Sequence, residues 1–138
     1  MIMNRPFPPC RKRATPVIPD RHCHDLPTMT FLYLCSDQMG DGDPALGRLL
    51  MTKFLAQLAV SDTPVDMIGC VNGGVKLTTE GSAVIDSLRA LADRGARIAT
   101  CATCLDHLGL TDKLLIGATG TMEQSVRAMA MADKIIRP

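Results

Sequence analysis

The sequence predicts a single α/β domain with a mostly parallel sheet of about five strands and helices on both faces. Short apolar segments of strand length alternate with longer segments of helical periodicity, which is the pattern of βαβ units. The strand segments are apolar almost throughout, as expected for strands covered on both sides. The chain has 138 residues, which is enough for one such domain and too few for two.

The first unit begins at residue 29. A buried strand is expected at 30–36, because this segment is a continuous apolar run. A polar loop follows, and a helix is expected from Pro44 to about Val60, with Asp43 as its N-cap. Four apolar residues are expected to form the buried face of this helix: Leu46, Leu50, Phe54 and Leu58.

The second unit has the same organisation. A buried strand is expected at 65–71, followed by a loop over 72–81. A helix is expected from the cap Ser82 to about Arg94, with Gly95 as its C-terminal stop. Its buried face should consist of Val84, Leu88 and Leu91.

The rest of the chain contains shorter elements. A third strand at 96–101 leads into a short helix that Gly109 ends, and a fourth short strand is expected at 113–117. The capping box Thr121–Gln124 starts a last helix, which runs to about Ala132 before a final strand at 133–137. The expected buried residues of that helix are Met122, Val126 and Met129.

Residues 1–28 are expected to be a tail outside the domain, which spans 29–138. Six of the nine prolines lie in this stretch, and its five basic residues outnumber two acidic ones, for a net charge of +3. The prolines disfavour a helix, and few large apolar residues are present to be buried. A chain that starts at Met29 is therefore expected to fold and melt like the full chain.

Composition excludes several classes of protein. The net charge of +1 provides no strong field for nucleic acid. No apolar run has the length of a membrane span, and no secretory signal is visible. The sequence therefore predicts a cytoplasmic chain with reduced thiols, in which a Cys-x-x-Cys indicates redox, transfer or metal chemistry.

The main chemical feature is Cys101-Ala-Thr-Cys104, where an apolar strand meets a short helix. At a helix N-terminus, the backbone N–H groups and the helix dipole favour the thiolate, which is the nucleophile and the metal ligand. The spacing also allows a dithiol–disulfide cycle. Cys101 and Cys104 are therefore the candidate catalytic residues, and neither a bound cofactor nor a resident metal is expected.

Other arrangements of these residues remain open. Cys101, Cys104 and His107 offer three zinc ligands, although a structural zinc site needs four and no second pair with zinc spacing occurs within 29–138. The remaining alternative is that Cys101 and Cys104 are two incidental core residues without a chemical role. Cys35 and Cys70 also lie near strand ends and are expected to fill the core as small apolar groups.

Two residues of the loop beyond the second strand are candidate contributors to a pocket. In open α/β sheets, sites form beyond the carboxyl ends of the strands. Asn72 and Lys76 follow such an end, and the lysine would attract an anionic substrate. A solvated surface lysine is the commoner case.

Four segments carry a resemblance to a known family: Phe31–Asp43, Gly74–Ser82, Cys101–Asp106 and Ala132–Pro138. On these segments, residues 29–138 resemble the C-terminal DsrE-like domain of YedF-type proteins, described as sulfurtransferase-like proteins of selenium metabolism. Such proteins usually carry an N-terminal TusA-like domain with a Cys-Pro-x-Pro motif. Residues 1–28 are too short for that domain and lack the motif.

The resemblance implies a sulfur relay. In the wider DsrE family, a cysteine at a strand end, before a short helix and a glycine, carries a persulfide. Cys101 matches this cysteine by its spacing to Gly109, and Cys104 is the additional thiol of the YedF-type domain. The implied protein carries sulfur, or selenium, between donor and acceptor proteins, with a TusA-like carrier acting in trans, and forms homo-oligomers.

Two rival functions stay open. One is a non-catalytic binding subunit of an oligomer, in which the thiols are inert. The other is a metal-binding protein that uses Cys101, Cys104 and His107.

Overall fold

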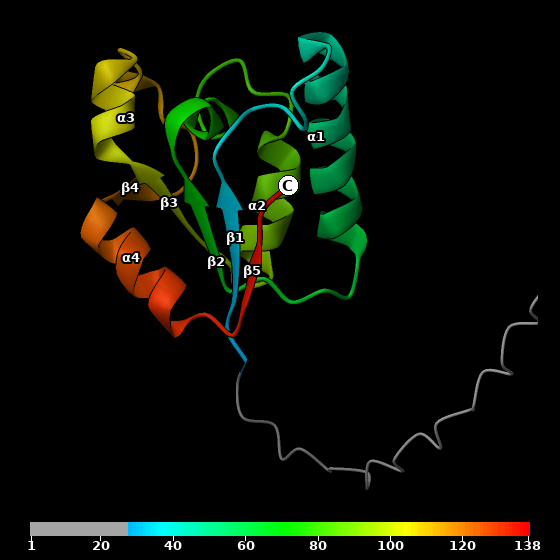
Figure 1. Ribbon diagram of the computed structural model, residues 1–138, viewed down its shortest axis with the longest axis vertical. Helices are drawn as coiled ribbons and strands as arrows, with labels where there is room; N and C mark the ends of the chain where they lie inside the picture. The colour runs from blue at the N-terminus through cyan, green and yellow to red at the C-terminus, as the bar shows by residue number, and fades with distance from the viewer. Residues whose placement is uncertain (1–27) are drawn as a thin grey trace, which may run out of the picture.

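A computed structural model describes residues 28–138, and the expectation of a tail over 1–28 falls almost entirely outside them. The described residues contain one five-stranded sheet with the order β4-β3-β2-β1-β5, in which every neighbouring pair is parallel (Figure 1). The predicted fold class is therefore confirmed. The strands are β1 (Thr30–Leu34), β2 (Met67–Cys70), β3 (Arg97–Cys101), β4 (Ala118–Gly120) and β5 (Lys134–Ile136).

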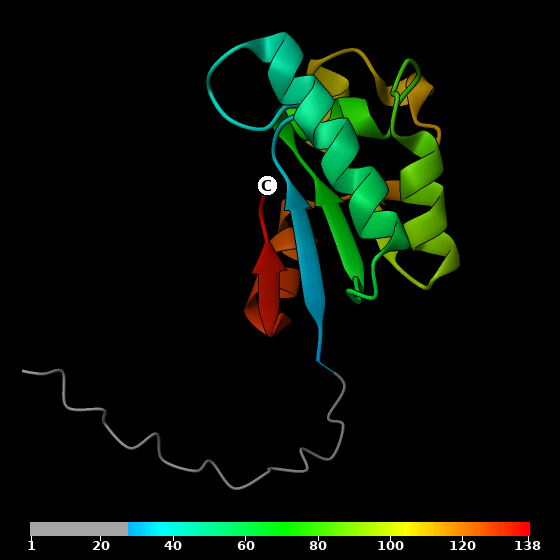
Figure 2. The same ribbon diagram turned by 90° about the vertical axis from the view of Figure 1, so that its right-hand side faces the viewer.

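The helices lie on both faces of the sheet. α1 and α2 pack against each other on one face, and α4 lies on the opposite face (Figure 2). The strand order explains this arrangement, because the chain crosses the sheet in one direction from β1 to β4 and returns to reach β5. The α-helices are α1 (Pro44–Val60), α2 (Ile85–Asp93), α3 (Ala102–His107) and α4 (Met122–Met131), and the 3₁₀ helices are η1 (Asn72–Leu77) and η2 (Thr111–Lys113).

Local capping signals fix the starts of α1 and α4 as expected, but the predicted cap Ser82 is wrong, because α2 begins at Ile85 with Val84 as its N-cap. The Asp43 carboxylate accepts the N–H of Ala45 at 2.9 Å, and Pro44 is the first residue of α1. At the start of α4 the Gln124 N–H donates to the Thr121 hydroxyl at 3.3 Å, and the Thr121 N–H donates to the Gln124 side chain at 3.0 Å. These bonds satisfy backbone donors that have no partner within the helix.

The predicted buried face of α1 is wrong for two of its four residues. Leu46 and Leu50 are exposed, and Phe54 is half-buried, while Leu58 is buried as expected. The packing at Gly47 explains the rotation, because a Cβ there would lie only 2.8 Å from the Cβ of Gln38. The buried face of α1 consists of Gly47, Met51, Leu55 and Leu58.

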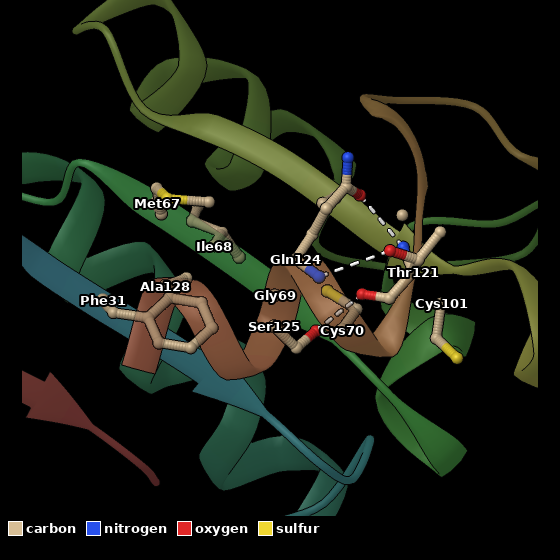
Figure 3. Close-up of a pocket in the computed structure, with 12 residues that line it drawn as sticks. Phe31, Met67, Ile68, Gly69, Cys70, Cys101, Thr121, Gln124, Ser125 and Ala128 are labelled. Carbon is tan, nitrogen blue, oxygen red and sulfur yellow. Dashed lines mark hydrogen bonds between the residues drawn. The ribbon is translucent and has the colours of Figure 1, made fainter. Parts of the chain in front are cut away.

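The predicted buried face of α4 is also wrong. Met122 and Val126 are exposed to 56% and 60%, Met129 is half-buried, and Ala128 is the residue that packs onto the sheet. A small side chain suits this position, because the ring of Phe31 already fills the space beneath it (Figure 3). By contrast, the buried face predicted for α2 is confirmed at Val84, Leu88 and Leu91.

The fourth strand lies further along the chain than expected. Segment 113–117 pairs with the loop after η1 instead of with β3. The Glu80 N–H donates to the Lys113 carbonyl, and the Leu115 N–H donates to the Thr78 carbonyl, both at 2.9 Å. The edge strand β4 then begins at Ala118, beyond Gly117, whose φ of +78° suits glycine.

Two apolar clusters divide the interior. The larger cluster lies between the sheet and the helices α1 and α2. The smaller one lies at the carboxyl end of the sheet, beneath α3 and η1, and consists of Val71, Val75, Cys101 and Leu105. No helix within residues 28–138 is long and apolar enough to cross a membrane.

Candidate functional site: a thiol cluster at the carboxyl end of the sheet

Cys101 lies where the sequence predicts it, at the end of β3 and at the N-cap of α3. It is 8% exposed. Figure 3 shows it beside Thr121, at one end of a small pocket between α4 and the sheet, with Phe31 at the other end. The pocket has room for about one water molecule. Cys101 is thus held between the first turns of two helices, its own and α4.

Cys104 is half-buried on α3 and contacts Cys101 through a thiol–thiol hydrogen bond. The backbone N–H of Asn72 donates to the Cys104 Sγ at 3.2 Å. Desolvation raises the pKa of Cys104 most, the hydrogen bond with Cys101 raises it further, and the Asn72 N–H opposes both. Burial and the contact with Cys101 therefore favour the protonated form of Cys104.

Asn72 reaches Cys104 through an unusual backbone conformation. Its φ is +50°, and it is the one non-glycine residue among 28–138 with a positive φ. Asparagine tolerates this left-handed region better than most residues. The sequence pointed to Asn72 as a member of the pocket, but the group that contacts the site is the main-chain N–H.

The close fit of η1 onto the sheet positions that N–H. Gly74 lies directly against the main chain of Leu34, and a Cβ at Gly74 would collide with the Leu34 carbonyl oxygen. The same carbonyl accepts the Val71 N–H at 3.0 Å. The end of β1 and the start of η1 are thus joined through main-chain groups, which brings Asn72 over α3.

Cys35 and Tyr33 lie beside the site, although the sequence did not predict either of them as a site residue. Cys70 is fully buried as expected, but Cys35 is only half-buried and packs against the cluster that contains Cys101. Tyr33 packs against the same cluster and hydrogen-bonds the Cys35 thiol. The signal that could have found both residues is their position near the end of β1, since the carboxyl ends of parallel strands share one edge.

Burial is the main factor that raises the pKa of Tyr33, and the charge of the Cys35 thiolate and its hydrogen bond raise it further. The negative charge of Cys101 acts in the same direction, and Arg137 opposes it. The phenol therefore stays protonated at neutral pH and remains a hydrogen-bond donor. Its neighbours are sulfur atoms that become anionic when they react.

Lys76 and His107 stay outside the thiol cluster. Both side chains are exposed. Among residues 28–138, no group of three or more His, Cys, Asp or Glu side chains is arranged to hold a metal ion. Cys101, Cys104 and His107 therefore do not form the ligand set considered from the sequence.

The fold is shared with proteins of known structure. The chain superposes on the ychN protein from E. coli with a TM-score of 0.61 at 16% identity, over 80% of this chain and 99% of that chain. It superposes on MTH1491, a protein of unknown function from Methanobacterium thermoautotrophicum, with a TM-score of 0.56 at 20% identity and the same coverage. No protein-family model and no curated protein matches the sequence. The two structural matches place this chain in the DsrE-like α/β fold.

Proposed function

We propose that this chain is a thiol-based sulfur carrier of the sulfurtransferase-like kind, with Cys101 as the acceptor. The observation that carries the proposal is the hydrogen-bonded series from the Asn72 N–H through Cys104 to Cys101. Two thiols in contact, one of which has a raised pKa, are arranged as a nucleophile with a supporting hydrogen-bond donor. The DsrE-like fold and the sequence resemblance support the same assignment.

The chemistry needs no bound cofactor. The Cys101 thiolate attacks the terminal sulfur of a donor persulfide, the donor S–S bond breaks, and the donor leaves as a thiolate. Cys101 then holds a persulfide. Cys104 either donates a hydrogen bond to that persulfide or attacks its inner sulfur, which forms the Cys101–Cys104 disulfide and releases hydrosulfide.

The sequence resemblance supports the biological setting of the proposal. On this resemblance, the chain receives sulfur from a TusA-like protein and passes it to an acceptor protein. Selenium is the alternative cargo. Reduced thiols are required throughout, so the proposed compartment is the cytoplasm.

Intact-mass analysis after exposure to polysulfide tests the proposal. The wild-type chain should gain the mass of one sulfur atom on Cys101, and the Cys101→Ser variant should not load, because a serine hydroxyl is not a comparable nucleophile near neutral pH. Cys104→Ser should still load and should keep its persulfide longer if Cys104 normally resolves it. Loading of the Cys101→Ser protein at Cys104 would reverse the assignment. Equal loading of the wild type and of a variant without both thiols would end it.

The exposed side of α4 favours a second function, that of an oligomeric binding subunit. Met122, Val126 and Met131 of α4 are exposed, and Ile135 of the adjacent strand β5 is exposed as well. An apolar stripe of this kind suits the homo-oligomer that the resemblance implies. A Val126→Glu variant should run as a smaller species in light scattering than the wild type. Unchanged oligomers together with inert thiols would count against both functions.

A further inference from the structure

A third cysteine, Cys35, borders the apolar cluster around Cys101, and the proposed transfer step does not use it. Cys35 directly follows β1 and packs against the cluster of Val71, Val75, Cys101 and Leu105. We propose that Cys35 is a second sulfur-carrying residue, which takes the sulfane sulfur from Cys101 within the same molecule. This proposal rests on the proposed function, because it requires that Cys101 be loaded first.

The surroundings of Cys35 separate it from an ordinary core cysteine. It is half-buried, whereas Cys70 is fully buried. Its thiol hydrogen-bonds the hydroxyl of Tyr33, the single tyrosine of the chain. The Tyr33 hydroxyl also lies within electrostatic range of Cys101. Cys35 and Cys101 therefore both border the same apolar cluster and both interact with the Tyr33 hydroxyl.

The transfer step is balanced without any further reactant. The Cys35 thiolate attacks the terminal sulfur of the Cys101 persulfide, so a new S–S bond forms on Cys35 as the old one on Cys101 breaks. The proton of the terminal sulfur moves with it, and Cys101 leaves as a thiolate. A persulfide extends the Cys101 side chain by about 2 Å, which lengthens the reach of the reacting sulfur.

Two hydrogen-bond donors are placed to stabilise the negative charges that this step produces on sulfur. Cys104 has a raised pKa and hydrogen-bonds Cys101, so as a donor it stabilises the thiolate that leaves. Tyr33 hydrogen-bonds Cys35 and stabilises the persulfide that forms. Cys104 can thus act on the Cys101 persulfide in two competing ways. As a hydrogen-bond donor it assists transfer to Cys35, and as the resolving thiol it attacks the inner sulfur and releases hydrosulfide.

Cys70 provides an internal control. It ends β2, between the strands that lead to Cys35 and Cys101, but it belongs to the other cluster, beneath α1 and α2. Its thiol is fully buried there. Cys70 should therefore carry no sulfur, and Cys70→Ala should leave the distribution between Cys35 and Cys101 unchanged.

The test uses the full chain with Cys10 and Cys23 changed to serine. The remaining thiols that can carry sulfur are then Cys35, Cys70, Cys101 and Cys104. The protein is loaded briefly with polysulfide, the excess is removed, and the persulfides are trapped with iodoacetamide at successive times. Tandem mass spectrometry then locates the added sulfur. We expect it first on Cys101 and later on Cys35, with a rate that does not depend on protein concentration.

Two variants make the result specific. In Cys35→Ser, Cys101 should still load, and the sulfur should remain on Cys101 at least about tenfold longer than in the parent. In Tyr33→Phe, the arrival of sulfur at Cys35 should slow relative to the loading of Cys101. Each variant is compared with Cys70→Ala, which should behave like the parent.

The outcomes separate this proposal from the proposed function. Sulfur that loads Cys101 and never reaches Cys35 overturns the second carrier and leaves the first intact. A transfer rate that rises with protein concentration also overturns it, because the step is then intermolecular. A Cys35–Cys101 disulfide with release of hydrosulfide overturns it as well. Absence of sulfur from every thiol overturns the proposed function together with this inference.

Discussion

The backbone N–H of Asn72 donates to the Sγ of Cys104 at 3.2 Å, although the two residues are 32 positions apart in the chain. The bond joins η1, which follows β2, to α3, which follows β3. It depends on the positive φ of Asn72 and on the absence of a side chain at Gly74. One thiol of the candidate site is thus held by main-chain geometry.

Replacement of Asn72 tests the contribution of its backbone conformation. Asn72→Val should lower the free energy of unfolding by about 1–3 kcal/mol, because a β-branched residue is strained at positive φ. Asn72→Gly is the matched control and should lose far less. Urea denaturation measures both. If valine is tolerated as well as glycine, the left-handed conformation does not constrain the fold.

The same variant has a chemical readout. The Asn72 N–H lowers the pKa of Cys104 against the larger effects that raise it. Valine keeps the N–H, but by leaving the left-handed conformation Asn72→Val should move this donor away from Cys104 and so raise the pKa of Cys104 further. The pH dependence of alkylation at Cys104, followed by peptide mapping, should shift to higher pH in the variant and stay in place in Asn72→Gly.

Gly74 and Gly42 form a matched pair for the docking of η1. A methyl group at Gly74 would collide with the Leu34 carbonyl oxygen, whereas one at Gly42 would meet no atom within 4 Å. Gly74→Ala should therefore destabilise the protein by about 1–3 kcal/mol through overpacking. Gly42→Ala should be neutral or slightly stabilising, because it reduces the freedom of the unfolded chain. Similar melting temperatures for the two variants would contradict the close contact.

Signals within a few residues of each other were readable from the sequence. Asp43 before Pro44 gave the start of α1, and Thr121 with Gln124 gave the start of α4. The position of Cys101 at a strand–helix junction was equally local, because an apolar strand and a short helix meet there. Such features depend on backbone donors and acceptors that lie next to each other in the chain.

Features that depend on tertiary contacts were not readable. α1 carries leucines around much of its circumference, and the contact of Gly47 with Gln38, which orients the helix, comes from the folded loop. The place of Cys35 in the cluster depends on the packing of β1, η1 and α3, which periodicity does not encode. The contact between Asn72 and Cys104 likewise exists only after the sheet has formed.

A buried hydroxyl pair supports the strand that leads to Cys101. The hydroxyls of Thr78 and Thr100 lie 2.9 Å apart, both side chains are fully buried, and Thr78 also donates to the Val75 carbonyl at 3.0 Å. Thr78→Val leaves the Thr100 hydroxyl without a partner and should cost about 1–3 kcal/mol. Thr100→Val should cost less, because Thr78 keeps its bond to Val75. Urea unfolding ranks the two variants, and the reverse order would contradict this account.

Cys70 should make the stability of the protein depend on alkaline pH. Desolvation, and secondarily the charge of Cys35, raises the pKa of Cys70 from 9.0 to about 12. The folded protein therefore keeps a neutral thiol where the unfolded chain already ionises. Because the folded pKa is the higher one, this stabilisation is fully present below pH 9 and is lost as the pH rises from 9 to 12.

The difference between wild type and Cys70→Ala isolates this effect, because other alkaline titrations cancel in the comparison. The free energy of unfolding of the wild type should fall by about 2 kcal/mol more than that of the variant between about pH 8 and pH 10.5. The variant itself should be less stable at pH 8 by about 1 kcal/mol, since it loses a buried sulfur atom. Urea denaturation at both pH values gives the double difference. Parallel pH profiles for the two proteins would mean that Cys70 ionises as readily in the folded state as in the unfolded chain, against its complete burial beneath α1 and α2.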